Sequence, residues 1–128
     1  MLNQSHAFSS FSVDDVERTR TFYAQTLGLD VGSVEGMPEL LELRLRDGVK
    51  VMLYAKPNHE PASFTVLNFP VEDVEATVEE LRRRGVKFEI YHDGPVRTDD
   101  RGISTGNGPT IAWFRDNAGN ILSVLSER

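Results

Sequence analysis

"FSVDDVERT", residues 11–19, returns 58 residues later as "FPVEDVEAT", residues 69–77, with six of the nine positions identical. Helix starts often resemble one another, because acidic residues interact favourably with the positive end of the helix dipole. Here the flanking sequence repeats as well: a strand-like run precedes each stretch, and a helical pattern follows that ends at Gly28 or Gly85. We therefore interpret the chain as a duplication of one structural unit.

Three strand-like runs follow the glycine in each half. Tight turns separate the last two runs, because Asp, Asn and Gly favour such turns: Asp47-Gly48 in the first half and Asp116–Asn120 in the second. The strands that we expect are 7–13, 29–34, 40–46 and 49–55, then 64–71, 86–91, 110–115 and 120–125. Each half then has the order βαβββ, and the two modules, about 6–56 and 62–126, form a single domain over residues 1–128.

The helices and the longest connection complete this outline. Asp14 and Glu17 have the spacing of a capping box at the start of the first helix. The halves differ mainly by an insertion, residues 92–109, which is polar, rich in glycine and long for a compact domain. We expect it to be either a binding lid or a mobile loop, with Asp99, Asp100 and Arg101 either closing over a ligand or simply solvated.

The composition limits the classes of protein that come into question. Apolar residues make up 39% and charged residues 27%, as in ordinary globular domains. The absence of cysteine excludes disulfides, thiolate metal sites and a cysteine nucleophile, and it fits a cytoplasmic location. The net charge of −6 disfavours nonspecific binding of nucleic acid, and no apolar run approaches a membrane span. We expect neither nucleic acid nor a membrane as a partner.

One set of residues carries a resemblance to a known family: Val13–Glu17, Phe22-Tyr23, Leu27–Leu29, Val71–Glu75, Leu81, Gly85-Val86 and Trp113–Leu122. In these residues the repeated pattern resembles the vicinal oxygen chelate superfamily, which includes glyoxalase I, extradiol dioxygenases, fosfomycin-modifying enzymes and bleomycin-resistance proteins. The resemblance runs from about residue 6 to residue 125. It implies an α+β fold in which two tandem βαβββ modules form an open, cupped mixed sheet with the helices on its outer face. It also implies a homodimer.

Alternation along the strands assigns the side chains to the two faces of the sheet. The consistently apolar face should contact the helices, and it holds Phe11, Val13, Leu41, Leu43, Leu45, Val51, Leu53, Phe69, Val71, Ala112, Phe114, Leu122 and Val124. The opposite parity should face the cup. It holds His6, Phe8, Ser10, Ser12, Glu42, Arg44, Met52, Tyr54, Val66, Asn68, Ile111, Trp113, Ser123 and Leu125.

Enzymes of this superfamily usually hold a divalent metal ion with four cup-facing residues. The resemblance places these positions at Phe8, Met52, Val66 and Ser123 of this sequence. Zn²⁺, Ni²⁺, Mn²⁺ and Fe²⁺ are bound by imidazole nitrogen or carboxylate oxygen, which none of these four side chains provides. We therefore expect no metal site at these positions and no cofactor.

Few other residues are candidates for chemistry. Glu42 is a weak candidate for a general base, although an ion pair with Arg44 on the same strand is the alternative that we favour. His6 shares the cup face, so a slipped strand would bring it to the site. His59 and His92 are interpreted as solvated loop residues.

Aromatic and apolar side chains on the cup face favour a site for a small organic ligand. A flat or cationic ligand would stack on Tyr54 or Trp113, although these rings also suit contact with a dimer partner or with the insertion. Small polar side chains would orient the ligand. The predicted ligand-binding residues are Phe8, Ser10, Arg44, Met52, Tyr54, Val66, Asn68, Trp113 and Ser123.

Three functions are compatible with this pattern. The first is a metal-free protein that binds a small molecule, similar in kind to bleomycin-resistance proteins. The second is a lyase, isomerase or ring-cleaving enzyme related to glyoxalases and dioxygenases, with non-standard metal ligands or a metal-free mechanism. The third is a structural or regulatory protein that keeps the fold for its dimer surface.

Overall fold

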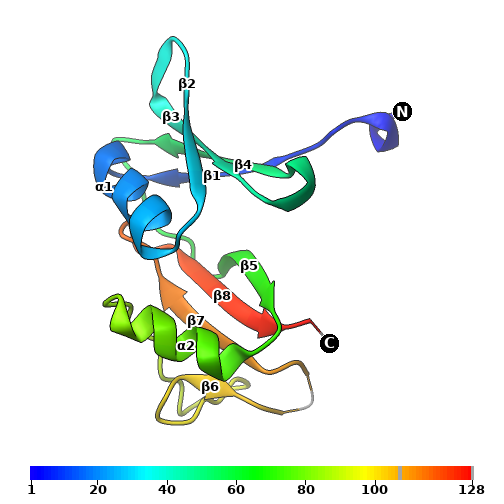
Figure 1. The fold of residues 1–128 in the computed structure, drawn as a ribbon, viewed down its shortest axis with the longest axis vertical. Coiled ribbons are helices and arrows are strands. Elements are labelled where there is room, and N and C mark those ends of the chain that lie inside the picture. Colours follow the sequence, from blue (N-terminus) through cyan, green and yellow to red (C-terminus); the bar gives the residue numbers. More distant parts are fainter. Residues whose placement is uncertain (107, 128) are drawn as a thin grey trace. The chain divides into compact units, whose positions relative to one another are not determined.

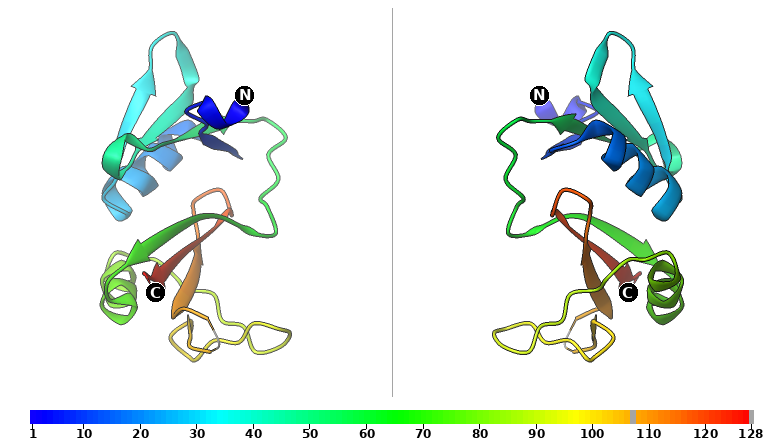
Figure 2. Two further views of the ribbon diagram at one scale, coloured as in Figure 1. Left: turned by 90° about the vertical axis from the view of Figure 1, so that its right-hand side faces the viewer. Right: turned by 90° about the vertical axis from the view of Figure 1, so that its left-hand side faces the viewer.

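The structure, a computed structural model that describes residues 1–106 and 108–127, divides into two compact units. Unit 1 is Met1–Glu60 and unit 2 is Pro61–Arg128. Each unit contains a four-stranded sheet with a helix against one face (Figures 1 and 2). The boundary falls in the linker, residues 57–61, between the two expected modules. The α+β fold with tandem modules is confirmed. That the two modules form a single domain stays a prediction.

In unit 1 the sheet has the strand order β1-β4-β3-β2. The first and last strands, β1 and β4, pair in parallel, and the other neighbours are antiparallel. The π-helical turn η2 continues helix α1 directly. The elements are η1 (Leu2–Gln4), β1 (Ser9–Val13), α1 (Val16–Thr21), η2 (Phe22–Thr26), β2 (Asp30–Val34), β3 (Met37–Arg44), η3 (Arg46–Gly48) and β4 (Lys50–Ala55).

Unit 2 repeats this arrangement with the strand order β5-β8-β7-β6. Again the first strand pairs in parallel with the last, and β7 pairs antiparallel with β8 and β6. No helix in the described part of the chain is long and apolar enough to cross a membrane. The elements are β5 (Thr65–Val71), α2 (Val74–Arg83), β6 (Ile103–Ser104), β7 (Ile111–Arg115) and β8 (Ile121–Ser126).

The expected strand at residues 86–91 is wrong. This segment contributes one bridge to β7, between Phe88 and Phe114, and the Glu89 N–H donates to the Trp113 carbonyl at 2.8 Å. The other half of the same edge of β7 pairs with β6, which lies inside the insertion. Because β7 has five residues, two segments divide its edge and neither forms a long strand there.

Burial follows the predicted division of the sheet faces at most positions, but Ser123, on the predicted open face, is fully buried as well. In unit 1 the alternating residues Val13, Leu41, Leu43, Val51 and Leu53 are at most 4% exposed, and they form the core with the buried Thr19 and Tyr23. In unit 2 the buried face of α2 packs on β7 and β8. Its core includes Val74, Val78, Leu81, Ala112, Phe114, Leu122 and Val124, while Phe11, Leu45, Phe69 and Val71 are half-buried.

The repeated stretches cap the two helices in the same way. Asp15 accepts a hydrogen bond from the Arg18 N–H at 3.0 Å, and Asp73 accepts one from the Ala76 N–H at 3.0 Å. One turn later the hydroxyl of Thr19 donates to the Asp15 carbonyl, as Thr77 does to Asp73. Both bonds thus recur at equivalent positions of the two modules, which supports the duplication.

The predicted capping role of Asp14 is wrong. Helix α1 begins at Val16 and its N-cap is Asp15, so Asp14 lies one residue too early to reach the free N–H groups of the first turn.

The predicted hairpin turn is confirmed. Asp47 and Gly48 both have positive φ, 60° and 76°, as the tight turn between β3 and β4 requires.

We expect Asp15→Ala to lower the free energy of unfolding by about 1 kcal/mol, because the first turn of α1 loses its capping acceptor. Asp14→Ala is the matched control, since it removes the same charge from the neighbouring exposed position. Urea unfolding of the two variants measures the difference. Equal losses in both variants would contradict the assignment of the cap to Asp15.

Candidate functional site

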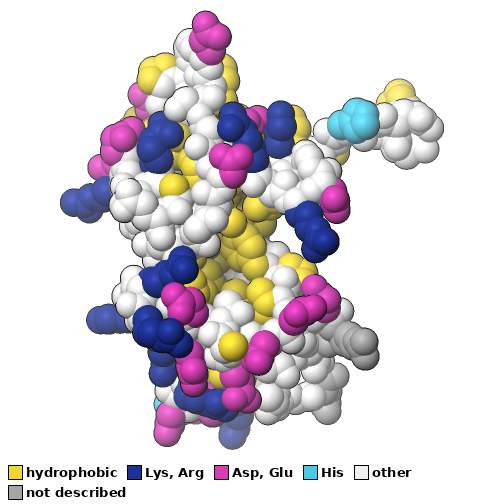
Figure 3. Space-filling model, viewed as in Figure 1, with side chains coloured by type: hydrophobic (Ala, Val, Ile, Leu, Met, Phe, Trp, Pro, Cys, Tyr) yellow, Lys and Arg dark blue, Asp and Glu magenta, His cyan; other side chains and the backbone are white. Residues whose placement is uncertain are grey.

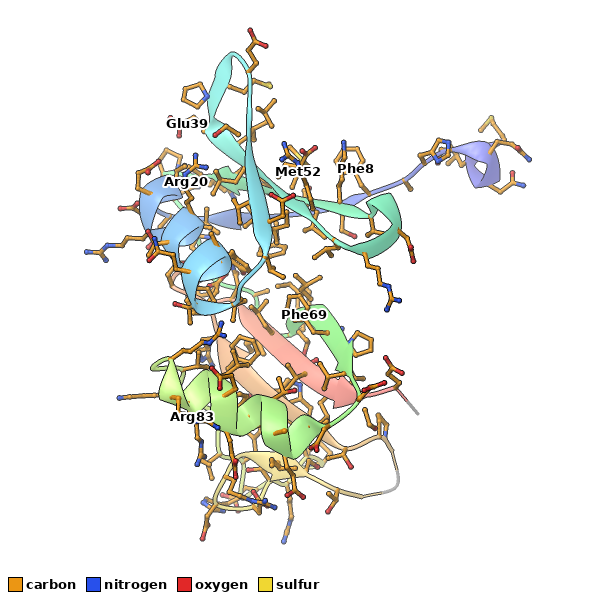
Figure 4. The ribbon with its side chains drawn as sticks, viewed as in Figure 1. Phe8, Arg20, Glu39, Met52, Phe69 and Arg83 are labelled. Atoms are coloured by element: carbon orange, nitrogen blue, oxygen red, sulfur yellow. The ribbon has the colours of Figure 1, made fainter. Side chains whose placement is uncertain are left out.

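The open face of each sheet is the face opposite its helix, and in unit 1 it carries the predicted residues in two rows. Strand pairing places Ser10 beside Met52, and Met52 beside Glu42. The next row pairs Ser12 with Tyr54. Phe8, just before β1, is 67% exposed, and Figure 4 shows it on the same side of the sheet as Met52. The structure therefore brings the predicted residues of this unit together on one surface.

Charged side chains cross this open face from β4 to β2. Glu42 accepts from the Arg44 Nε at 2.9 Å and lies 3.2 Å from the Lys50 Nζ. Arg44 also reaches Asp30 at 3.7 Å. The guanidinium lies directly over Gly32, so a Cβ atom at this position would displace the end of the Arg44 side chain.

This network confirms the predicted Glu42–Arg44 ion pair. The hydrogen bond from Arg44, and then the one from Lys50, lower the pKa of the Glu42 carboxyl below its ordinary value. A general base that works near neutral pH needs the opposite shift. The geometry thus favours a structural role for Glu42.

His59 lies on the same open face, where the sequence had not placed it. Its Nδ1 is 2.7 Å from the Ser12 Oγ, and the ring is half-buried. The Lys56 N–H donates to the Val13 carbonyl and the His59 N–H to the Lys56 carbonyl, so the linker turns back over the end of β1. The interpretation of His59 as a solvated residue is therefore wrong, whereas His6 and His92 are exposed.

The four positions that the resemblance assigns to metal ligands do not fit a metal ion. Phe8 is largely exposed, Met52 and Val66 are half-buried, and Ser123 is fully buried. Val66 lies where the β5–β8 pairing shifts register. Among residues 1–106 and 108–127, no three His, Asp or Glu side chains come together in a group that would hold a metal ion.

On the open face of unit 2, Asn68, Ser123 and Trp113 form one row across β5, β8 and β7. The Ser123 hydroxyl donates to the Asn68 Oδ1 at 2.5 Å. This bond satisfies a polar group in the middle of the central strand, where an unpaired hydroxyl would destabilise the fold. The role of both side chains in ligand binding stays a prediction.

A pocket of about 450 Å³ opens beside Trp113 in unit 2. Trp113 is the one predicted site residue that lines it. The Tyr91 ring meets the Trp113 ring edge-on, with centroids 5.6 Å apart and planes at 74°. A third ring, that of Phe64, is 66% exposed. The lining residues are Ser63, Phe64, Thr65, Tyr91, Asp93, Pro95, Val96, Trp113 and Ile121.

The sequence pattern did not identify Phe64 and Tyr91 as site residues. Phe64 lies just before β5, and Tyr91 ends the alternating segment 86–91 that was expected to be a strand. Burial of the phenol, followed by the charge of Glu89, raises the pKa of Tyr91. Tyr91 is therefore a neutral phenol at physiological pH, able to donate or accept a hydrogen bond.

The insertion has two parts with different roles. Its first part, which includes Asp93, Pro95 and Val96, lines the pocket. Two hydrogen bonds join the ends of this loop: the Tyr91 N–H donates to the Thr98 Oγ1 at 3.0 Å, and the Thr98 N–H donates to the Tyr91 carbonyl at 2.9 Å. The second part is held against α2. There Arg82 donates to the Arg101 carbonyl at 2.8 Å, and Arg101 lies 3.2 Å from Glu75.

Asp99 organises this second part, accepting hydrogen bonds from the N–H groups of Arg101 and Ile103. The bond from Ile103 is the main reason why the pKa of Asp99 is lowered. Asp99 and Arg101 therefore fasten the insertion to α2 while both side chains remain exposed to solvent. Closure of these residues over a ligand stays a prediction.

Ion pairs also lie elsewhere on the described surface. Figure 3 shows acidic and basic side chains interspersed over α2, where Glu80 contacts both Arg83 and Arg84. A second hollow, of about 330 Å³, lies between α1 and the β2–β3 hairpin. Its rim includes Arg20, which donates to the Ser33 Oγ and lies 3.8 Å from Glu17. None of the predicted site residues lines it.

The sequence matches the model of a family described as the Glyoxalase/Bleomycin resistance protein/Dioxygenase superfamily over residues 4–124. No curated protein sequence matches the chain.

Solved structures with the same fold include TnmS3, an antibiotic binding protein from Streptomyces sp. CB03234. It is 24% identical with a TM-score of 0.69, over 96% of this chain and 97% of that chain. A glyoxalase/bleomycin resistance protein from the same organism is 26% identical with a TM-score of 0.61, over 94% and 100% of the two chains. FosX, a fosfomycin resistance protein from Listeria monocytogenes, is 12% identical with a TM-score of 0.68, over 98% and 94%.

We expect the carboxyl group of Glu42 to titrate below the ordinary pKa of glutamate, about 4.3, and Arg44→Met to raise this pKa. The ion pairs then stabilise the fold at pH values above the ordinary pKa of glutamate. This stability is lost as the pH falls through the lowered pKa of Glu42 in the folded state. Carboxyl-detected NMR titration measures the shift, with Arg46→Met, a cation in the adjacent turn, as the control. A raised pKa in the wild type would restore Glu42 as a candidate base.

Proposed function

The chain belongs to the Glyoxalase/Bleomycin resistance protein/Dioxygenase superfamily, and within this family we propose that it is a metal-independent binding protein for a small organic molecule. The observation that carries the proposal is the pocket beside Trp113. Its volume, about 450 Å³, lies in the range of about 300–1,000 Å³ that is usual for ligand sites.

The lining of this pocket suits an aromatic ligand. Trp113, Tyr91 and Phe64 offer three rings, and stacking on such rings is worth on the order of 1 kcal/mol beyond the area buried. Ser63, Thr65 and the phenol of Tyr91 provide hydrogen-bonding groups that orient a ligand. An apolar wall with a few polar groups is the usual composition of a small-molecule site.

The donor chemistry supports binding without a metal ion. Phe, Met, Val and Ser occupy the four positions that the family resemblance assigns to ligands, and these side chains do not replace imidazole or carboxylate. One structural neighbour supports the binding of a small molecule, since TnmS3 is an antibiotic binding protein. We propose that this chain, like such a protein, sequesters its ligand without transforming it.

An enzyme that acts without a metal ion is the second candidate. The Ser12–His59 contact of 2.7 Å favours it, because an imidazole beside a hydroxyl is an arrangement that general-base catalysis uses. The chemistry in that case is that of a lyase, an isomerase or a ring-cleaving enzyme. A turnover that His59→Ala abolishes and Trp113→Ala does not would favour this second function.

A homodimer and a cytoplasmic location are further proposals that rest on the family resemblance and on the absence of cysteine. Light scattering at micromolar concentration distinguishes a dimer from a monomer of 14.4 kDa.

We expect Phe64→Ala to weaken the binding of planar aromatic compounds about fivefold, the effect of losing about 1 kcal/mol of ring contact. Trp113 is the single tryptophan, so quenching of its fluorescence serves as the screen for compounds that bind. Phe8→Ala is the matched control, because Phe8 is equally exposed but lies in unit 1. If only Phe8→Ala weakened binding, the open face of unit 1 would be the site.

We also expect stripped protein to bind no Zn²⁺, Ni²⁺, Mn²⁺ or Fe²⁺ stoichiometrically at micromolar concentration, because the assigned positions lack donor groups. Calorimetric titration measures binding, and elemental analysis of unstripped protein provides an independent check. Stoichiometric metal in either experiment would overturn the metal-independent proposal. His59→Ala and Glu42→Ala would then show which side chain takes part.

A further inference from the structure

The following inference deepens the proposed function and rests on it. We infer that the pocket beside Trp113 selects a planar aromatic cation, and that Asp93 is the residue that discriminates the charge of the ligand. Asp93 lies in the first part of the insertion and lines the pocket together with Pro95 and Val96.

The formal charge of the pocket lining is the first argument. Of its nine lining residues, Asp93 alone carries a charge at neutral pH. The nearby cation Arg115 contacts Glu89 at 3.1 Å and donates to the Gly119 carbonyl at 3.0 Å, so its charge is matched. His92 and Arg97, the other titratable residues next to Asp93 in the insertion, are exposed and are not among the lining residues. Among the described residues that line the pocket, the only formal charge is therefore negative.

The arrangement of the rings is the second argument. The planes of Tyr91 and Trp113 are almost perpendicular, so the two rings form a corner and the exposed ring of Phe64 adds a third apolar surface. The face of an aromatic ring is electron-rich and attracts a cation, most strongly in the case of tryptophan. A planar cation stacked on one ring gains this attraction together with the apolar contact, whereas an anion of the same shape is repelled.

The closed base of the loop is the third argument. The two hydrogen bonds between Tyr91 and Thr98 fix the ends of the segment that carries Asp93. Gly94 has a φ of 89°, which permits the chain to turn directly after Asp93. The carboxylate is thereby attached to the same short segment as the Tyr91 ring, and less ordering is needed when a ligand binds.

The test uses one ring system in three charge states: N-methylacridinium, acridine at mildly alkaline pH, where it is neutral, and acridine carboxylate. Calorimetry on the full chain measures their affinities. We expect the cation to bind about tenfold more tightly than acridine at low salt and the anion to bind most weakly, with the difference reduced at high salt because exposed charges are screened.

We expect Asp93→Asn to weaken the binding of N-methylacridinium about fivefold and to leave acridine unchanged, as for the loss of an exposed charge pair. Asp100→Asn is the matched control. It changes the net charge equally from an exposed position of the same insertion that does not line the pocket. Circular dichroism and the thermal midpoint verify that both variants fold.

The outcomes separate the inference from the proposed function. If Phe64→Ala weakens all three probes while the cation has no advantage, or if Asp93→Asn and Asp100→Asn act equally, the inference is wrong and the binding function stands. If no acridine binds the wild type, the inference is also wrong. The fluorescence screen then decides on the binding function by itself.

Discussion

A four-stranded sheet that a single helix covers has one face left over, and this constraint governs both units. Burial of alternate residues pins the strand register, because a slip by one residue would move every apolar side chain to the opposite face. Val13, Leu41, Leu43, Val51 and Leu53 meet this requirement in unit 1. The equivalent side chains of β7 and β8 meet it in unit 2. What remains on the open faces is then available for recognition.

Periodicity made the helices, most strands and both sheet faces predictable from the sequence. The N-cap of α1 shows the limit of this prediction. The repeat located the start of the helix, but of two adjacent aspartates the spacing favoured Asp14, whereas Asp15 is the N-cap. Strand pairing was less predictable, since the alternation at residues 86–91 is that of a strand. Whether a segment completes a sheet depends on which other segments pair with the same edge, and β6 pairs with two of the five residues of β7.

The candidate site was predictable only where it lies on regular strands. Trp113 was found because strand parity placed it on the open face. Phe64 and Tyr91 stand at the ends of the expected strands 64–71 and 86–91, but neither was assigned to a face, and in the structure both lie outside the strands. Asp93 lies in a connection, where no periodicity assigns a direction to a side chain. His59 was missed for the same reason, because its position follows from two backbone hydrogen bonds of the linker. Ser123 shows a different limit, since its small hydroxyl is fully buried and bonded to Asn68, a pairing that local sequence does not reveal.

The divided edge of β7 also affects whether this sheet can pair edge to edge with other molecules. An exposed strand edge is a template for pairing with another molecule, and natural sheets avoid this with very short or interrupted edge strands. β7 has the sequence Ile-Ala-Trp-Phe-Arg, rich in residues that favour cross-β stacking. The two-residue strand β6 and the bridge at Phe88 cover its outer edge without offering a long edge of their own. Cleavage within the part of the insertion that is fastened to α2 would therefore expose an edge of β7 to pairing with other molecules.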